Sequence, residues 1–228
     1  MKYCPACNAM TLDNEALYCT ECGSPLSDKL VMQSGNRTPV PNSSDTSSAV
    51  KVVKGHKVDL SKTQTVFERL RIDINWQSDA DYDIDAAAFL LNQTGKVSDE
   101  TDFVFYNNPK HHSGAVMHSR LNNQFERITI ELKKLPSAVS KIDFTLTIND
   151  ADIRRQNFGR VHSIVLSVID DVTNKELIHY ALGDFTVEMA IVIGEIYQHK
   201  GKWKFHAIGA GFSGGLAALC NNFGIETN

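Results

Sequence analysis

Four cysteines near the start of the chain have the spacing of a metal site. Cys4 and Cys7 form one Cys-x-x-Cys pair, and Cys19 and Cys22 form a second pair after an eleven-residue spacer. A two-residue spacer lets a tight turn point both thiolates of a pair at one ion, so two pairs can close a tetrahedral Cys4 site around Zn²⁺. The pattern predicts a zinc ribbon, with disulfides as the competing interpretation.

The segment that carries these cysteines is too short to fold by itself. About thirty residues bury too little apolar surface to offset the entropy lost on folding, whereas zinc contributes about 10 to 16 kcal/mol in comparable peptides. We therefore expect structural zinc in a ribbon over residues 1–32. A Ser-rich stretch with two prolines over 33–50 predicts a flexible linker, and residues 51–228 form the second domain.

Cysteine usage favours a reducing compartment, and we expect a soluble, cytoplasmic protein. Residues 1–12 contain no signal-peptide core, and no run of eighteen apolar residues occurs. The formal net charge of -4 argues against a general nucleic-acid binder, since neutralising phosphates needs clustered Lys and Arg. Local nucleic-acid binding through the ribbon stays open as a less favoured alternative.

An acidic run carries the strongest chemistry of the second domain. Asp79, Asp81, Asp83 and Asp85 alternate with other residues, and no Lys or Arg occurs from position 72 to 95. Alternate residues of an extended chain lie roughly 6.7 Å apart on one face, so these carboxylates repel one another unless they are solvated or share a cation. Oxygen ligands of this kind prefer Ca²⁺ or Mg²⁺.

A calcium site in this run would have to be assembled from several segments. An EF-hand is excluded because Gly and Glu are missing from its sixth and twelfth positions. Two asparagines after the apolar run 103–106 are plausible partners of the aspartates. A solvated acidic loop is the alternative. The candidate calcium ligands are Asp81, Asp83, Asp85, Asn107 and Asn108.

Short segments rich in β-branched and aromatic residues recur between turn signals and predict strands. Helical spacing of apolar residues predicts helices over 188–197 and 216–223. Together the elements predict a mainly β fold, a two-sheet β-sandwich with a few helices at its ends. The predicted strands are 66–75, 86–91, 103–106, 128–132, 141–148, 163–170, 177–180 and 203–208.

Several blocks of the second domain together resemble the TerD family of tellurite-resistance and stress-response proteins. The sequence DYDIDAAAFLL at 81–91, followed by DFVFYNN at 102–108, is similar to the core signature of that family. Further similar blocks follow in the family's order, and the resemblance covers essentially 51–228. These blocks are QNFG at 156–159, GEIY at 194–197, KWKF at 202–205 and GAGFSGGL at 209–216.

The resemblance implies a β-sandwich that binds calcium and acts in the stress response, often beside related proteins in membrane-associated assemblies. It implies no established enzymatic activity. One segment departs from the family, whose members carry a Gly- and Asp-rich acidic loop after the Asn-Asn block. Here residues 111–126 contain Glu126 as their only acidic residue. We therefore expect weakened calcium binding, at one site or none.

The segment 111–126 carries histidines in place of the family's carboxylates. His111, His112 and His118 lie in a polar stretch, so we expect them to be solvated. Binding of a softer metal is the alternative.

Two motifs near the end of the chain resemble catalytic signatures, but we do not interpret them as active or cofactor sites. After Gly-x-Gly-x-x-Gly at 209–214, a dinucleotide site needs a further strand and an acidic residue about twenty positions on, and only fourteen residues of the given sequence remain. Gly-x-Ser-x-Gly at 211–215 needs a later histidine, and none follows Ser213 in the given sequence. We expect these glycines to serve close backbone packing and a turn. Cys220 is expected to be a buried apolar residue.

Two functions from different classes follow from these patterns. The first is a cytoplasmic, non-enzymatic stress-response module that binds a divalent cation and whose zinc ribbon recruits a protein partner. The alternative is a magnesium-dependent hydrolase or transferase of small phosphorylated substrates, with the carboxylates of 79–85 holding the metal. Nothing in the sequence identifies a nucleophile or base for such an enzyme.

Overall fold

The computed structural model describes residues 2–3, 10–11, 49–60, 67–79 and 81–226. The chain divides into two units, Met1–Thr46 and Ser47–Asn228. In the first unit β1 (Lys2–Tyr3) pairs antiparallel with β2 (Met10–Thr11). The predicted zinc ligands Cys4, Cys7, Cys19 and Cys22 and nearly all of the predicted linker lie outside the described residues. The zinc site and the domain boundaries therefore stay predictions.

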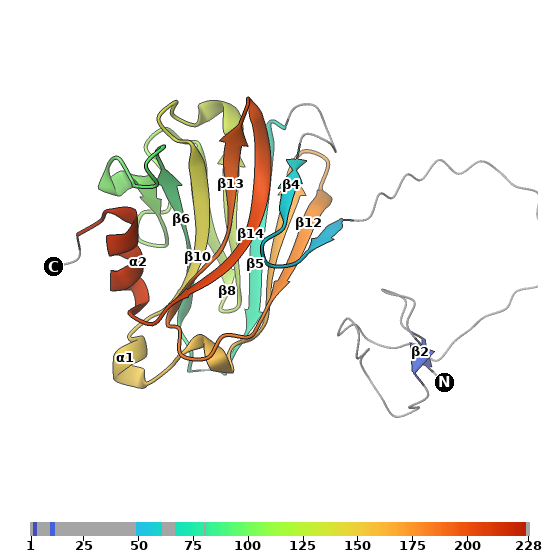
Figure 1. Ribbon diagram of the computed structural model, residues 1–228, viewed down its shortest axis with the longest axis vertical. Helices are drawn as coiled ribbons and strands as arrows, with labels where there is room; N and C mark the ends of the chain where they lie inside the picture. Colours follow the sequence, from blue (N-terminus) through green and yellow to red (C-terminus); the bar gives the residue numbers. More distant parts are fainter. Residues whose placement is uncertain (1, 4–9, 12–48, 61–66, 80, 227–228) are drawn as a thin grey trace, which may run out of the picture. The chain divides into compact units, whose positions relative to one another are not determined.

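The second unit contains two six-stranded sheets that pack face to face (Figure 1). The first sheet has the order β4-β14-β13-β10-β6-β7, and the second has the order β3-β12-β11-β5-β9-β8. Neighbouring strands pair antiparallel except β3 with β12. The strands are β3 (Val50–Val52), β4 (Lys57–Asp59), β5 (Arg69–Gln77), β6 (Ile84–Leu91), β7 (Phe103–Val104), β8 (Val116–Asn122), β9 (Phe125–Glu131), β10 (Lys141–Ile148), β11 (His162–Asp170), β12 (Lys175–Leu182), β13 (Ala190–His199) and β14 (Lys202–Phe212).

Few helices accompany the sheets. The α-helix α2 (Gly215–Phe223) lies against the outer face of the first sheet, and the short α1 (Ala151–Arg154) follows β10 (Figure 1). No helix of the described residues is long and apolar enough to cross a membrane. The remaining helical turns are η2 (Glu100–Asp102), η3 (Leu132–Lys134) and η4 (Phe158–Arg160).

Two apolar clusters stabilise the second unit. The main core lies between the sheets and contains the inward residues of β9, Ile128 and Ile130, as the predicted alternation of that strand requires. A smaller cluster lies on the outer face of the first sheet, where Phe89 of β6 packs against Phe223 of α2 with ring centroids 4.5 Å apart. The first sheet is therefore buried on both faces where α2 covers it.

The predicted two-sheet sandwich and the helix at 216–223 are confirmed, but the helix predicted at 188–197 is wrong. That segment contains most of strand β13. Ile191 and Ile193 face the main core, whereas Val192 faces the cluster under α2. Residues 190–194 are all buried and show no two-residue period, so the apolar residues of the segment matched a helical spacing by coincidence.

The glycines of the last strand serve close packing, as predicted. Gly209 has φ +65°, a conformation that favours glycine. A Cβ atom at Gly211 would lie 2.2 Å from the Cγ of Glu188. Cys220 of α2 is buried, as expected.

Candidate functional site

The acidic run lies on the connection from β5 to β6 and continues into β6. Tyr82 and Ile84 are buried, whereas Asp81 is exposed and Asp83 and Asp85 are half-buried. This alternation directs the aspartates away from the main core, as an extended chain requires. The sequence therefore placed these carboxylates on one side correctly.

Arg120 of β8 joins the aspartates to a buried carboxylate. Its guanidinium is hydrogen-bonded to Asp85, and Nη1 lies 3.6 Å from Oδ1 of Asp83. Its Nε donates to Oε1 of Glu126 at 2.8 Å, and Nη2 donates to the carbonyl of Ile84 at 3.3 Å. A planar guanidinium suits this position because it carries five donors in a fixed fork.

Glu126 is fully buried, and hydrogen bonds satisfy both of its oxygens. Its Oε2 accepts hydrogen bonds from Nε2 of His118 and from the backbone N–H of Ala86, both at 2.7 Å. Since burying a carboxylate costs several kcal/mol unless it is paired and hydrogen-bonded, these donors are required for the fold. We call this cluster the acidic corner; it comprises Asp83, Asp85, His118, Arg120 and Glu126.

The charges of the acidic corner shift the acidities of its members. Burial raises the pKa of Asp85 to about 6, because desolvation outweighs the attraction of Arg120. Burial opposes the charge of Arg120 as well, yet the carboxylates of Glu126 and Asp85 hold the pKa of the guanidinium above its usual value. Arg120 therefore stays cationic and acts as an internal counter-ion.

The other candidate calcium ligands have protein partners of their own. Oδ2 of Asp81 accepts a hydrogen bond from Nε2 of Gln156 at 3.0 Å. Asn108 closes its own loop, since its Nδ2 donates to the carbonyl of Phe103 at 2.7 Å. Asn107 is exposed in the preceding turn.

The structure thus brings Asp83 and Asp85 together but engages Asp81 and Asn108 elsewhere. Among the residues described, no group of three or more His, Cys, Asp or Glu side chains is arranged to hold a metal ion. The five predicted calcium ligands do not fit a bound cation in this arrangement, since a cation between Asp83 and Asp85 would have to displace Arg120. Calcium binding itself stays a prediction.

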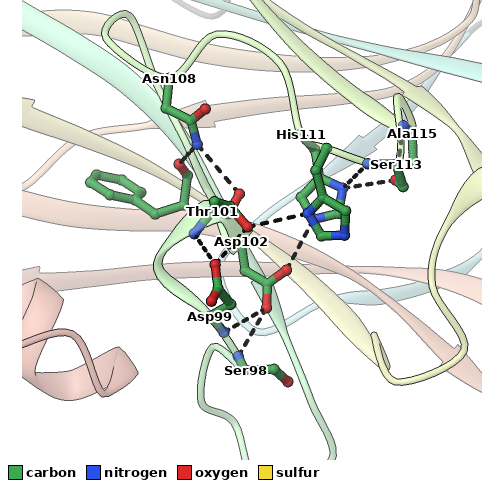
Figure 2. A network of polar contacts seen from close by, with 10 residues as sticks. Ser98, Asp99, Thr101, Asp102, Asn108, His111, Ser113 and Ala115 are labelled. Carbon is green, nitrogen blue, oxygen red and sulfur yellow. Dashed lines mark hydrogen bonds and ion pairs between the residues drawn. The ribbon is translucent and has the colours of Figure 1, made fainter.

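A second polar network surrounds His111, as Figure 2 shows. Nε2 of His111 lies 3.0 Å from Oδ1 of Asp102, and Nδ1 lies 2.7 Å from Oγ of Ser113. The N–H of Ser113 also donates to Nδ1 at 3.2 Å, which makes Nδ1 the acceptor and leaves the proton on Nε2. Asp102 is held in turn by the backbone N–H groups of Ser98 and Asp99, at 2.9 and 3.2 Å.

This network has the residue types of a Ser-His-Asp triad but not the access that catalysis needs. His111 is 0% exposed, and Oγ of Ser113 accepts a hydrogen bond from the N–H of Ala115 at 3.1 Å. The network therefore anchors its loop. The prediction that the three histidines are solvated is wrong for His111 and His118, which are buried, while His112 is exposed.

Another ionisable cluster crosses the outer face of the first sheet. Asp143 of β10 is paired directly with Glu195 of β13, which is paired with His206 of β14. Nζ of Lys141 lies 3.1 Å from Oε2 of Glu195 and 3.5 Å from Oδ1 of Asp143. Nδ1 of His206 lies 2.9 Å from Oε1 of Glu195. We call these four residues the ionic row.

Asp143 is the least satisfied member of the ionic row. It is 3% exposed, and among the described residues its Oδ1 has no hydrogen-bond partner. Burial raises the pKa of Asp143 to about 7 despite the nearby charge of Lys141, and Glu195 raises it further. Sequence analysis missed this cluster, since its members become neighbours only through strand pairing.

Comparison with known proteins identifies the domain that the second unit matches. The model of the TerD domain matches residues 48–223. The chain is 39% identical to the tellurium resistance protein TerD of Alcaligenes sp, over 79% of this chain and 100% of that protein. It is 38% identical to general stress protein 16U of Bacillus subtilis (strain 168), over 78% of this chain and 98% of that protein.

A solved structure has a similar fold. The crystal structure of a homologue of telluride resistance protein (TerD) from Streptomyces coelicolor A3(2) aligns with a TM-score of 0.56 at 17% identity. The alignment covers 68% of this chain and 95% of that one.

Proposed function

The chain belongs to the TerD domain family, and we propose that it is a non-enzymatic, cytoplasmic stress-response module whose N-terminal zinc ribbon recruits a protein partner. One observation carries the proposal: the acidic corner, where a catalytic metal would otherwise bind, is closed by the protein's own Arg120. Relatives carry names of tellurium resistance and general stress, which supports protection against tellurite as its task.

Arg120 takes the place of a bound cation in this proposal. The guanidinium contacts Asp83, Asp85 and Glu126 together, so a calcium ion has to compete with an attached counter-ion. We expect little or no calcium on the wild-type chain. Replacing Arg120 with Ser leaves the carboxylates without a counter-ion, and the Arg120→Ser variant should gain calcium-dependent thermal stability.

The ribbon part of the proposal is supported by the two Cys-x-x-Cys pairs and by the antiparallel pairing of β1 with β2, which flank the first cysteine pair in sequence. Structural zinc would supply the folding energy of so short a hairpin, and we propose that the hairpin presents its surface to another protein. Cysteines kept as thiolate ligands also fit a reducing compartment. Other stress-response proteins, in a membrane-associated assembly, are the partners we propose.

The proposal is tested by growth on potassium tellurite of a bacterial strain that lacks its own TerD-family genes. The full chain should restore growth, and a Cys4→Ser, Cys7→Ser double variant should lose both the rescue and one zinc ion in native mass spectrometry. A Ser24→Ala variant near the second cysteine pair is the control and should behave as wild type. Magnesium-dependent turnover of a phosphorylated substrate by the purified chain would overturn the non-enzymatic assignment.

A further inference from the structure

A cavity of about 370 Å³ lies on the outer face of the first sheet, between α1 and the start of α2. Its floor includes Ala87 and Thr147, which alternate with core residues of β6 and β10 and therefore point away from the main core. The volume is within the range of about 300 to 1,000 Å³ that small-molecule sites have. The cavity shares Asp85 with the acidic corner, and the proposed function assigns it no ligand.

The rim of the cavity carries large apolar side chains that remain exposed. Tyr106, Ile153 and Leu216 are 59%, 83% and 43% exposed and come from the loop after β7, from α1 and from α2. Scattered apolar residues on a surface need no explanation, but apolar residues from separate segments that gather around one cavity indicate a binding site.

Aromatic rings form one wall. Phe103 and Phe105 are stacked with centroids 4.4 Å apart, and the ring of Tyr106 stands at 88° to that of Phe105 with centroids 5.3 Å apart. All three residues line the cavity. The cavity therefore meets aromatic planes of two orientations, an arrangement that attracts organic cations through the negative faces of the rings.

The charged residues of the lining are all acidic. Among the described residues that line the cavity, Asp85, Asp150 and Asp152 are the charged ones, and Asp85 is already paired with Arg120. Arg154, in the same helix as Asp152, donates to the carbonyl of Asp81 at 3.3 Å and is not part of the lining. An anion is disfavoured by this lining, and a neutral apolar ligand would leave the carboxylates unused.

We propose that this cavity binds a small organic ammonium cation with an apolar body, the cation lying against Tyr106 and the carboxylates and the body against the stacked phenylalanines. The class follows from three features of the same cavity: aromatic planes, an apolar rim and an acidic lining. The cavity shares Asp85 with the acidic corner, so the test below uses Tyr106 and Asp152, which do not belong to the corner, to separate this inference from the proposed function.

Calorimetric titration of the full chain with benzyltrimethylammonium tests the proposal. Benzyl alcohol and benzoate carry the same ring without the charge or with the opposite charge. We expect benzyltrimethylammonium to bind at least about tenfold more tightly than benzyl alcohol, and benzoate not to bind. Equal affinities for the three compounds, or no binding of the cation, would overturn the proposal.

Variants at the exposed rim locate the site without disturbing the fold. Tyr106→Ala should weaken binding of benzyltrimethylammonium about fivefold through loss of the cation–π contact, and Asp152→Asn should weaken it and reduce its salt dependence. Val172→Ala removes an exposed apolar side chain that does not line the cavity and should bind as wild type does. If Tyr106→Ala and Val172→Ala bind equally well, the assigned cavity is wrong.

Discussion

The acidic corner and the ionic row each place carboxylates beside one cationic side chain, Arg120 or Lys141. The two clusters differ in how many carboxylate oxygens receive a hydrogen bond. In the acidic corner Arg120 and His118 leave neither oxygen of the buried Glu126 unpaired. In the ionic row Lys141 lies 3.5 Å from Oδ1 of Asp143, and within the described part of the chain that atom has no hydrogen-bond partner.

The difference follows from the shape of the two cations. A guanidinium presents donors along a fixed plane and can contact several carboxylates at once, whereas an ammonium is a compact point charge. The acidic corner therefore gives both oxygens of its buried carboxylate hydrogen-bond donors, while the ionic row favours a proton on Asp143, whose pKa burial raises to about 7. Four substitutions break or sharpen this comparison.

Loss of the buried acceptor in the acidic corner has the largest expected effect. Glu126→Gln places an amide N–H₂ where donors from His118, Arg120 and Ala86 converge. We expect the free energy of unfolding in urea to fall by about 3 kcal/mol at pH 7.5. Glu131→Gln makes the same change on the same strand at a half-buried position, and it should cost less than about 0.5 kcal/mol. Similar losses in both variants would contradict this account of the corner.

The pH dependence of stability is the second test. The pKa of Asp143 is raised from 3.8 to about 7 in the folded chain, so the folded state binds this proton more tightly than the unfolded state. Stability from this group is therefore complete below about pH 4 and is lost as the pH rises towards 7. In the Asp143→Asn variant the free energy of unfolding should fall by roughly 2 kcal/mol less between pH 4 and 7 than in the wild type. Urea unfolding at several pH values measures this difference.

Asp85 contributes to the pH dependence of stability that remains in the Asp143→Asn variant, since its pKa, raised to about 6, acts in the same direction. Asp184→Asn is the control, because Asp184 is exposed in a loop with positive φ that Asn tolerates. An unchanged pH profile in Asp143→Asn would show that Asp143 is not the group that titrates.

Arg120→Lys replaces the guanidinium of the acidic corner with an ammonium, the cation that the ionic row uses. The ammonium cannot reach Asp85, Glu126 and the carbonyl of Ile84 together, so the variant loses hydrogen bonds without losing charge. We expect a loss of about 1 to 2 kcal/mol in the free energy of unfolding. If the variant is as stable as the wild type, the positive charge stabilises the acidic corner and the several donors of the guanidinium do not contribute.

Much of the sandwich could be predicted from sequence because apolar and polar residues alternate along its half-buried strands. The segment 141–148 was predicted with the bounds that β10 has. Strand β13 was mistaken for a helix because residues 190–194 are buried on both faces and show no alternation of polar and apolar residues. Strand β8 was missed, since His118 and Arg120 occupy inward positions that apolar residues usually hold.

The candidate site was predicted only as far as local spacing reaches. The aspartates of 81–85 share a side because they alternate, and the sequence shows that directly. Their partner Arg120 lies on another sheet, and no local pattern links it to Asp85. The burial of His111 likewise depends on Asp102 and on a loop that folds over it, so a polar stretch was wrongly expected to be solvated.

The smallest expected effect is a gain in the ionic row. Lys141→Arg gives Asp143 and Glu195 a forked donor, and a hollow of about 350 Å³ lined by Lys141 and Asp143 leaves space for it. We expect the free energy of unfolding to rise by about 0.5 to 1 kcal/mol at pH 7.5. The decline of stability between pH 4 and 7 should also become shallower, because a hydrogen-bonded carboxylate holds its proton less tightly. A variant that is less stable yet has the wild-type pH profile would show that the difference between the two clusters comes from burial, and not from the shape of the base.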